Sequence, residues 1–406
     1  MADLLEKIMK YAGAKGTLVL RGELPPCKGR FRIVSVDDHL VEPPDTFEGR
    51  LPTRLQARAP RVVRDDTGID YWVFEDERVP LLGADAIRGW EPGKGYLGPV
   101  NFDEMHPAVW NIRERVRHMD VIGVEASLCF PSAPFGFAGW RFLRIKDREL
   151  GLASLRAFND WVLEVWAGSY PGRMIPCQLA WLADPVVAAD EIRRNARRGF
   201  AAVSFSENPE KLGLPSLYSR EWDPFFRACE ETGTVVNLHV GSSSETIVPS
   251  RDSSPAVLGA LFPINGMATA ADWLFAGIPV RFPDLKIAMS EGGIGWVPML
   301  IDRIEYMARV LDYRADFGPL SPVDVLRRNF WFTTFSDPST LPLREMIGVD
   351  HIMFETDYPH TDSSFPETQD LLARQVCGMS QEEIELITFR NAVRLYRFET
   401  VTTTCR

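Results

Sequence analysis

The chain has 406 residues, enough to bury a large core either in two ordinary domains or in one α/β barrel with insertions. Its 45% hydrophobic and 25% charged residues are typical of a folded globular protein and exclude a disordered one. The formal net charge of −11 and the isoelectric point near 5.2 argue against a nucleic-acid-binding protein, which needs a concentrated basic face, and against attraction to an anionic membrane.

Residues 1–30 are predicted to be an N-terminal extension. Charged residues interrupt the apolar ones in residues 1–11, so we expect no secretory signal there. The six cysteines are scattered and form no C-x-x-C pair, a pattern typical of reduced thiols in a cytoplasmic protein.

Residues 31–36 predict a short buried strand, and polar residues follow it at once. Asp37 and His39 are two positions apart, so on an extended backbone their side chains point to the same side. A carboxylate and an imidazole that project together make half of a divalent-metal site. The plainer alternative is an aspartate turn followed by a hydrogen-bonded core histidine.

Residues 45–105 do not continue the pattern of alternating strands and helices. Two short apolar segments on either side of the turn at residues 65–68 predict a β-hairpin. We therefore expect an insertion after the first strand, in a position where insertions commonly shape a substrate pocket.

From residue 106 onward, apolar strand patterns alternate with helical ones. Further strands are predicted at 125–130, 174–179, 201–205, 235–239, 286–290, 329–334 and 351–354. Helix starts are predicted at Asp184-Pro185, Asp223-Pro224, Ser321-Pro322 and the capping box of Ser380 with Glu383. With the first strand these make eight β/α units, so we predict a (β/α)8 TIM barrel over residues 31–397, with a C-terminal helical extension and a tail at 398–406.

The long apolar segment at residues 254–280 contains Pro263 and Asp272. Such interruptions favour two packed helices over a membrane span. Its apolar character makes a homodimer the expected assembly.

Candidate ligands follow the predicted strands at the end of the barrel where active sites gather. His239 ends the fifth strand, Glu291 follows the sixth and Asp357 follows the eighth. With Asp37 and His39, two imidazoles and two carboxylates would suit Zn²⁺ or Mn²⁺ and leave one position for water or substrate. Any one of them alone is as well explained by a structural role, but four at suitable strand ends favour the metal site.

Four segments together carry a resemblance to a known family. They are Asp-x-His at 37–39, Leu-His-Val-Gly at 238–241, Ser-Glu-Gly-Gly-Ile-Gly-Trp-Val-Pro at 290–298 and Glu-Thr-Asp-Tyr-Pro-His at 355–360. They resemble the amidohydrolase-related family, the branch of the amidohydrolase superfamily that contains aminocarboxymuconate-semialdehyde decarboxylase and the resorcylate-type decarboxylases.

The resemblance covers residues 31–397 and implies one divalent metal ion held by Asp37, His39, His239 and Asp357. Residues 204–209 contain no lysine, whereas a binuclear relative carries a carbamylated lysine at the end of the fourth strand. The chain departs from the family pattern at Asp37, where histidine or glutamate is common, and at Glu291, where many decarboxylase relatives carry histidine.

For the reaction, the resemblance implies non-oxidative decarboxylation of a small aromatic or unsaturated carboxylic acid, with Asp357 or Glu291 protonating the carbon. Hydrolysis of an amide, a lactone or a related bond by metal-activated water is the alternative, and the same residues serve it. Glu291 in place of histidine weakens the decarboxylase analogy, and Glu291 is also interpreted as an acceptor that holds a ligand. A barrel that binds a ligand without turnover is the third interpretation.

Several residues are predicted to line the substrate pocket. His360 follows the turn at Asp357, and Trp140, Trp296 and Phe365 are candidates for an apolar wall facing an aromatic substrate. In a chain with eleven tryptophans, a place in the core is the commoner role for Trp140 and Trp296.

Overall fold

The computed structural model describes residues 30–86, 98–243, 245–250, 252–311, 316–361 and 363–400. The predicted N-terminal extension up to residue 29 and the last part of the tail, residues 401–406, lie outside the described residues. The domain boundaries therefore stay a prediction.

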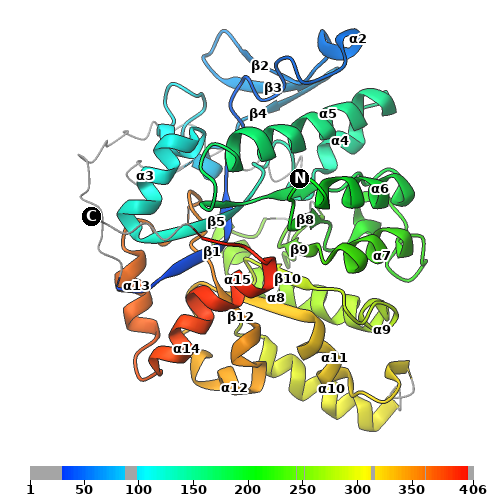
Figure 1. Cartoon of the computed structure of the whole chain (residues 1–406), viewed down its shortest axis with the longest axis vertical. Coiled ribbons are helices and arrows are strands. Elements are labelled where there is room, and N and C mark those ends of the chain that lie inside the picture. The colour runs from blue at the N-terminus through cyan, green and yellow to red at the C-terminus, as the bar shows by residue number, and fades with distance from the viewer. Residues whose placement is uncertain are drawn as a thin grey trace.

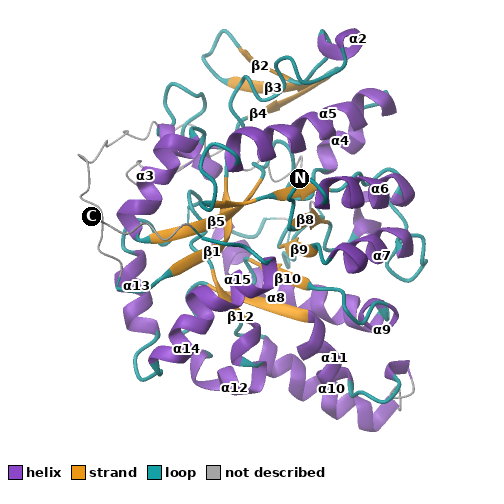
Figure 2. Ribbon diagram, viewed as in Figure 1, coloured by secondary structure: helices purple, strands orange, loops and turns teal. Residues whose placement is uncertain are grey.

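A parallel sheet forms the centre of the molecule, and helices surround it (Figures 1 and 2). The nine strands of this sheet end at β6 (Met174–Ile175) on one side and at β7 (Cys177–Leu179) on the other. Only Pro176 separates β6 from β7, and proline has no backbone N–H to give to a ladder. The two short strands are thus halves of one strand, the sheet closes on itself with eight strands, and the predicted TIM barrel is confirmed.

The other strands follow one another around the barrel in the predicted order. From the partner of β6 to the partner of β7 they are β5 (Val124–Phe130), β1 (Ile33–His39), β12 (Ile352–Phe354), β11 (Phe330–Thr334), β10 (Ile287–Ser290), β9 (Val235–His239) and β8 (Ala202–Phe205).

Helices follow most strands, and α-helices begin at all four predicted positions, three of them with the predicted side-chain cap. The described α-helices are α2 (Thr53–Gln56), α3 (Ile112–Ile122), α4 (Trp140–Arg144), α5 (Arg148–Trp161), α6 (Pro185–Ala196), α7 (Asp223–Thr232), α8 (Pro255–Phe275), α9 (Ile278–Arg281), α10 (Val297–Leu311), α11 (Pro322–Asn329), α12 (Arg344–Ile347), α13 (Thr368–Gln375), α14 (Gln381–Glu385) and α15 (Asn391–Tyr396). Asp184, Ser321 and Ser380 accept hydrogen bonds from the first turns of their helices. The prediction that Asp223 caps α7 is wrong, because its carboxylate pairs with Arg281 at 3.0 Å instead.

The apolar segment forms α8, which runs through Pro263 without a break, followed by the short helix α9. Among the described residues, no helix is long and apolar enough to cross a membrane.

The insertion after β1 carries a separate antiparallel sheet, at the top of Figure 1, formed by β2 (Arg61–Arg64), β3 (Asp70–Phe74) and β4 (Glu77–Pro80). The β2–β3 hairpin was predicted and the third strand was not. The buried ring of Trp72 packs on Phe47 and Phe135, with ring centroids 5.6 and 5.0 Å away. This contact holds the insertion against the loop that follows β5.

One end of the barrel is closed by the C-terminal helix α15, which lies across the barrel in Figure 1. Leu395 and Tyr396 pack against residues near the strand starts, including Val34 of β1 and Val235 of β9. The Tyr396 hydroxyl also donates to Asn237 Oδ1 at 2.6 Å. The polar candidate residues lie at the opposite end of the barrel, where the strands finish.

Candidate metal centre

The end of β1 places Asp37 and His39 in the barrel. The register between β1 and β5 shifts between Ser35 and Asp38, and such a bulge re-aims the side chains that follow it. Asp38 accepts hydrogen bonds from the Ser127 hydroxyl and from Tyr358 N, the latter at 3.0 Å. Asp37 and His39 instead both face His239.

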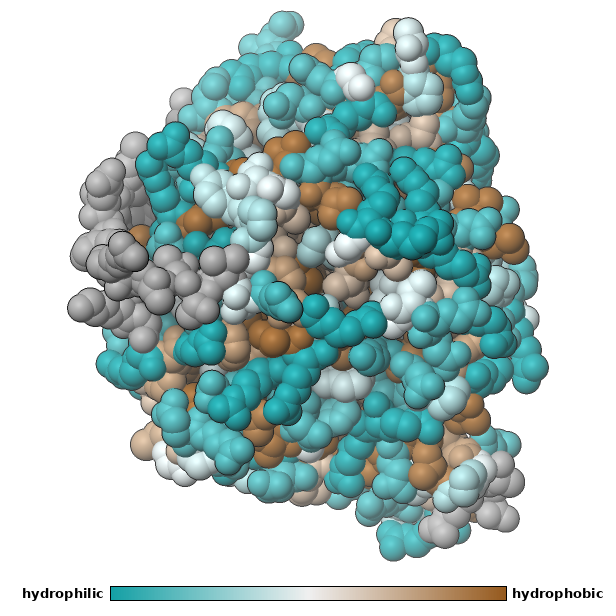
Figure 3. Space-filling model, in the orientation of Figure 1, coloured by the Kyte–Doolittle hydropathy of each residue, from teal (hydrophilic) through white to brown (hydrophobic). Residues whose placement is uncertain are grey.

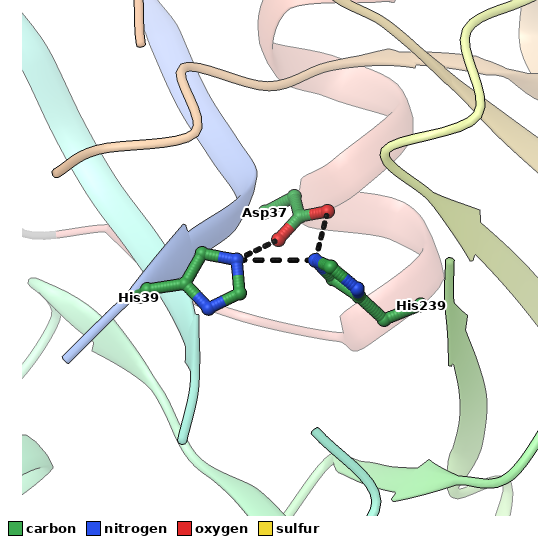
Figure 4. Close-up of side chains that lie close together, drawn as sticks. All are labelled: Asp37, His39 and His239. Carbon is green, nitrogen blue, oxygen red and sulfur yellow. Dashed lines mark hydrogen bonds and ion pairs between the residues drawn. The ribbon is translucent and has the colours of Figure 1, made fainter. Parts of the chain in front are cut away.

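These three side chains meet from opposite sides of the barrel (Figure 4). His39 Nε2 lies 3.5 Å from Asp37 Oδ1 and 3.1 Å from His239 Nε2, and His239 Nε2 lies 3.5 Å from Asp37 Oδ2. All three are fully buried, and their ligand atoms lie within 4.8 Å of one another. Ligand atoms held about 2.1 Å from one ion at tetrahedral angles are about 3.4 Å apart, which fits this spacing.

The donor atoms also have the chemistry that a cation needs. His239 Nδ1 lies 2.7 Å from the Val240 carbonyl, so Nδ1 carries the proton and Nε2 presents its lone pair to Asp37 and His39. Within the described part of the chain, neither carboxylate oxygen of Asp37 has a hydrogen-bond partner. Buried acceptors that face one another at these distances repel unless a proton or a cation lies between them.

The electrostatics favour a cation over protonated histidines. Burial, assisted by nearby His360, lowers the pKa of His39 to about 4, and burial also lowers the pKa of His239. Both imidazoles are therefore neutral at pH 7, the form that binds metals. Burial and the neighbouring carboxylates, led by Glu355, raise the pKa of Asp37. A divalent ion would relieve this crowding of buried negative charge.

Asp357, the fourth predicted ligand, follows β12. Its Oδ1 lies 3.4 Å from His39 Nε2 and 3.0 Å from His360 Nδ1, so these three side chains form a second group that shares His39 with the first. Burial by itself would raise the pKa of Asp357, but the charge and hydrogen bond of His360, together with His39, outweigh burial and lower it. The structure thus brings Asp357 to His39 and groups it with His360 rather than with His239.

Glu291 lies beside the candidate centre. Its Oε2 is 3.5 Å from His239 Nδ1, and its side chain is 12% exposed. Its backbone N donates to Glu355 Oε2 at 3.2 Å, and burial raises the pKa of Glu355 to about 8. Glu291 and Asp357 both have positive φ angles, 61° and 51°, a backbone conformation that non-glycine residues seldom adopt.

The three residues of the predicted aromatic wall are all buried, and their role in the pocket stays a prediction. Trp140 is 2% exposed and lies in the core beside Arg141, Trp296 is 3% exposed and donates to the Gly292 carbonyl, and Phe365 stacks on His118.

Phe137, which the sequence analysis missed, covers the imidazoles instead. Its ring centroid lies 4.2 Å from that of His239 and 5.0 Å from that of His39, and the side chain is partly exposed. Phe137 stands in an irregular loop after β5, where no periodicity could single it out.

His360 and Asp85 complete the surroundings. The His360 ring is 8% exposed and stacks on His39 with centroids 3.6 Å apart. Asp85, from the insertion, is 3% exposed, and its Oδ1 lies 3.7 Å from His360 Nε2. Burial raises the pKa of Asp85 to about 6, against the opposing effect of His360. Sequence reasoning gave Asp85 no role, because a single carboxylate in an insertion carries no pattern.

Comparison with known proteins shows the family of this chain. The profile of the family described as Amidohydrolase matches residues 66–398, which is most of the chain and includes His239, Glu291 and Asp357. This chain belongs to the amidohydrolase family. The amidohydrolase is therefore an enzyme of a metal-dependent superfamily, the resemblance seen in the sequence is confirmed, and the non-catalytic barrel is set aside.

Individual curated proteins and solved structures are also similar to this chain. The amidohydrolase is 26% identical over 277 residues to the gamma-resorcylate decarboxylase of Polaromonas sp. (strain JS666), a match that covers 65% of this chain and 82% of the relative. An amidohydrolase from Mycobacterium avium subsp. paratuberculosis superposes with a TM-score of 0.71 at 26% identity, covering 90% of this chain and 99% of the other. The 5-carboxyvanillate decarboxylase of Novosphingobium aromaticivorans, solved with manganese, superposes with a TM-score of 0.62 at 18% identity, covering 93% and 99%, which shows the shared fold.

Proposed function

We propose that this amidohydrolase holds one divalent metal ion and decarboxylates a small aromatic carboxylic acid without a redox cofactor. One observation carries the proposal. Asp37, His39 and His239 meet in a buried cluster with donor atoms 3.1–3.5 Å apart, and Asp357 lies 3.4 Å from His39. The decarboxylase named among its relatives supports the choice of reaction.

We propose Zn²⁺ or Mn²⁺ as the ion, held by Asp37, His39, His239 and Asp357. Imidazole nitrogens with carboxylate oxygens suit either metal, and the manganese of the 5-carboxyvanillate decarboxylase supports Mn²⁺. Asp37 and Asp357 both lie next to the same nitrogen of His39, its Nε2. Because that nitrogen can bind only one ion, this arrangement supports one ion rather than two. When bound, the ion would act as a Lewis acid that binds the acid's oxygens and orients the ring.

The chain's own residues would supply orientation and a proton. In decarboxylation the bond between the ring carbon and the carboxylate breaks, carbon dioxide leaves, and the electron pair left on the ring carbon takes up a proton. We propose Asp357 or Glu291 as the carboxyl group that carries that proton: Asp357 Oδ1 lies 3.4 Å from His39 Nε2, and Glu291 Oε2 lies 3.5 Å from His239 Nδ1. Phe137 would lie against the substrate ring and exclude water. A carboxylate that has lost its hydration is less stable, and this favours its loss as uncharged carbon dioxide.

Hydrolysis is the second candidate, favoured by one observation. Glu291 Oε2 lies 3.5 Å from Nδ1 of His239, a candidate metal ligand, and a glutamate in this position would serve as the acid or base of a hydrolase.

One experiment separates the two reactions. The purified enzyme would first be assayed for bound metal by elemental analysis, then incubated with gamma-resorcylate, 5-carboxyvanillate and related acids, and in parallel with aromatic amides and lactones in water labelled with oxygen-18. We expect carbon dioxide release with no label in the product. Label in the product without carbon dioxide would establish hydrolysis, and absence of bound metal would contradict both reactions.

We also propose that the enzyme is a homodimer that pairs through α8 and α10. Helix α8 contains one charged residue, yet it exposes a stripe at four-residue spacing: Ala256, Ala260, Ile264 and Ala268. On α10, Met299, Tyr306 and Val310 are at least 49% exposed and share one face. On the face seen in Figure 3, hydrophobic residues are dispersed among hydrophilic ones, as on an ordinary solvent-facing surface.

We propose a cytoplasmic location because the described cysteines are free thiols. Cys129, Cys177, Cys229 and Cys377 are free, and the first three are buried. Buried free thiols are typical of proteins from reducing compartments.

A further inference from the structure

We propose that Asp85, in the insertion, is a positioning residue that holds the His360 ring so that its Nδ1 points at Asp357. His360 lies between two carboxylates: Nδ1 is 3.0 Å from Asp357 Oδ1, and Nε2 is 3.7 Å from Asp85 Oδ1. The kinetic consequence of this arrangement depends on the proposed function, whereas the orientation of His360 can be measured without it.

The ring has one orientation that serves both carboxylates. If it flipped by 180° about its bond to Cβ, carbon atoms would replace both nitrogens, and neither carboxylate would have a donor to face. His360 and Asp85 are almost fully buried, so their attraction is weakly screened by water. Without Asp85, the present orientation would lose one of its two carboxylate contacts, whereas the stacking on His39 is the same for either orientation.

Asp85 is itself held firmly. Its second oxygen, Oδ2, accepts a hydrogen bond from Ala133 N at 2.8 Å, so the two oxygens have separate partners. Asp85 belongs to the short 3-10 helix η1 (Gly83–Ala86), which packs closely on Gly98. A Cβ atom added to Gly98 would lie only 2.5 Å from the Gly83 carbonyl oxygen. The insertion therefore delivers a fixed carboxylate to residues at the end of β12.

A neighbouring carboxylate offers a matched control. Glu42 is fully buried and accepts hydrogen bonds from Ser132 N at 3.1 Å and from the Ser132 hydroxyl. It therefore binds the same loop as Asp85, whose partner Ala133 is the next residue. The hydrogen bonds of Glu42 to Ser132 leave it outside the set of four proposed ligands, and glutamine fits there because the Ser132 hydroxyl can reverse its hydrogen bond.

The test compares Asp85→Asn with Glu42→Gln in the full-length, metal-loaded enzyme. In Asp85→Asn the amide oxygen keeps the bond from Ala133 N, while His360 loses its anionic partner. Neutron crystal structures, which distinguish ring nitrogen from ring carbon, should show His360 in the flipped orientation in Asp85→Asn and in the original one in Glu42→Gln. With a substrate in hand, Asp85→Asn should lower kcat about 10–100-fold with little change in KM or metal content, and Glu42→Gln should leave kcat unchanged.

His360→Gln provides the second variant. It should lower kcat about as much as Asp85→Asn, and the double variant should be no slower than His360→Gln alone, because Asp85 acts through the ring. The proposal is overturned if His360 keeps its orientation in Asp85→Asn, or if the two kcat losses multiply. If the enzyme binds no metal, the proposed function fails, yet the orientation of His360 in the two crystal structures still decides the role of Asp85.

Discussion

At the scale of single residues, His39 is the centre of the candidate site. Its Nε2 lies within 3.5 Å of donor atoms from Asp37, His239 and Asp357, and its ring stacks on His360. Because burial keeps its pKa near 4, this nitrogen stays available to a metal at any pH at which the enzyme would work. The site therefore depends on the barrel bringing β1, β9 and the end of β12 together.

His239→Ala and Glu291→Gln should separate metal binding from catalysis. His239→Ala removes a nitrogen donor, so bound metal should fall from about one ion per chain to a small fraction of that, and activity should fall at least about 100-fold. Glu291→Gln keeps the size of the side chain and removes its proton, so metal content should persist while kcat falls about 100–10,000-fold.

Elemental analysis after identical dialysis, together with steady-state kinetics, measures both effects. Full metal content in His239→Ala would remove His239 from the ligand set. A wild-type rate in Glu291→Gln would leave Glu291 only as a group that holds His239.

At the scale of elements, Glu207 joins three parts of the barrel. It follows β8 and accepts hydrogen bonds from Gly241 N at 2.9 Å, the Ser243 hydroxyl at 3.0 Å and the Thr269 hydroxyl of α8 at 3.2 Å. The turn after His239 is thereby tied to the helix proposed as the dimer interface. Burial raises the pKa of Glu207 to about 7, against the opposing effects of these bonds and of Lys211.

This raised pKa predicts a pH-dependent stability. Between about pH 4.5 and 7 the folded state binds the Glu207 proton more tightly than the unfolded state, so this contribution to the free energy of unfolding falls as pH rises, and is constant above pH 7. Over that range the loss should approach about 3 kcal/mol. Glu207→Gln should remove it, because the amide oxygen accepts from Gly241 and Ser243 while the NH₂ group donates to the Thr269 hydroxyl.

Urea unfolding of the wild type and of Glu207→Gln at pH 5 and pH 8 gives the difference directly. Glu210→Gln, at an exposed carboxylate in the following turn, is the control and should show a difference that does not change with pH. The same pH-independent difference for Glu207→Gln would mean that Glu207 is ionised throughout.

At the scale of the whole molecule, the exposed stripe of α8 leads to a test of assembly. Ile264 is 38% exposed within that stripe, so lysine there should leave the fold intact but place a charge in the proposed interface. Light scattering after size-exclusion chromatography should give a dimer of the 45.8 kDa chain for the wild type and a monomer for Ile264→Lys, with dimer dissociation raised at least about 10-fold.

Val186→Lys on α6 is the control for surface charge, because Val186 is 60% exposed and lies outside the stripe. It should remain a dimer. A wild-type chain that elutes as a monomer would contradict the proposed interface while leaving the metal site untouched.

The sequence by itself determined the barrel and the side chains that meet at its end. Strand and helix periodicities are local signals, so eight β/α units could be counted, and a barrel then places the residues after its strands at one rim. The spacing of Asp37 and His39, and the positions of His239 and Asp357 after their strands, followed from that rule.

Only the tertiary structure decided the surroundings of those side chains. Asp85 lies near His360, and Phe137 covers the imidazoles. Both residues stand in segments without a strand or helix periodicity. A side chain's neighbours across an irregular loop depend on how distant segments pack, and no local pattern in the sequence encodes that packing.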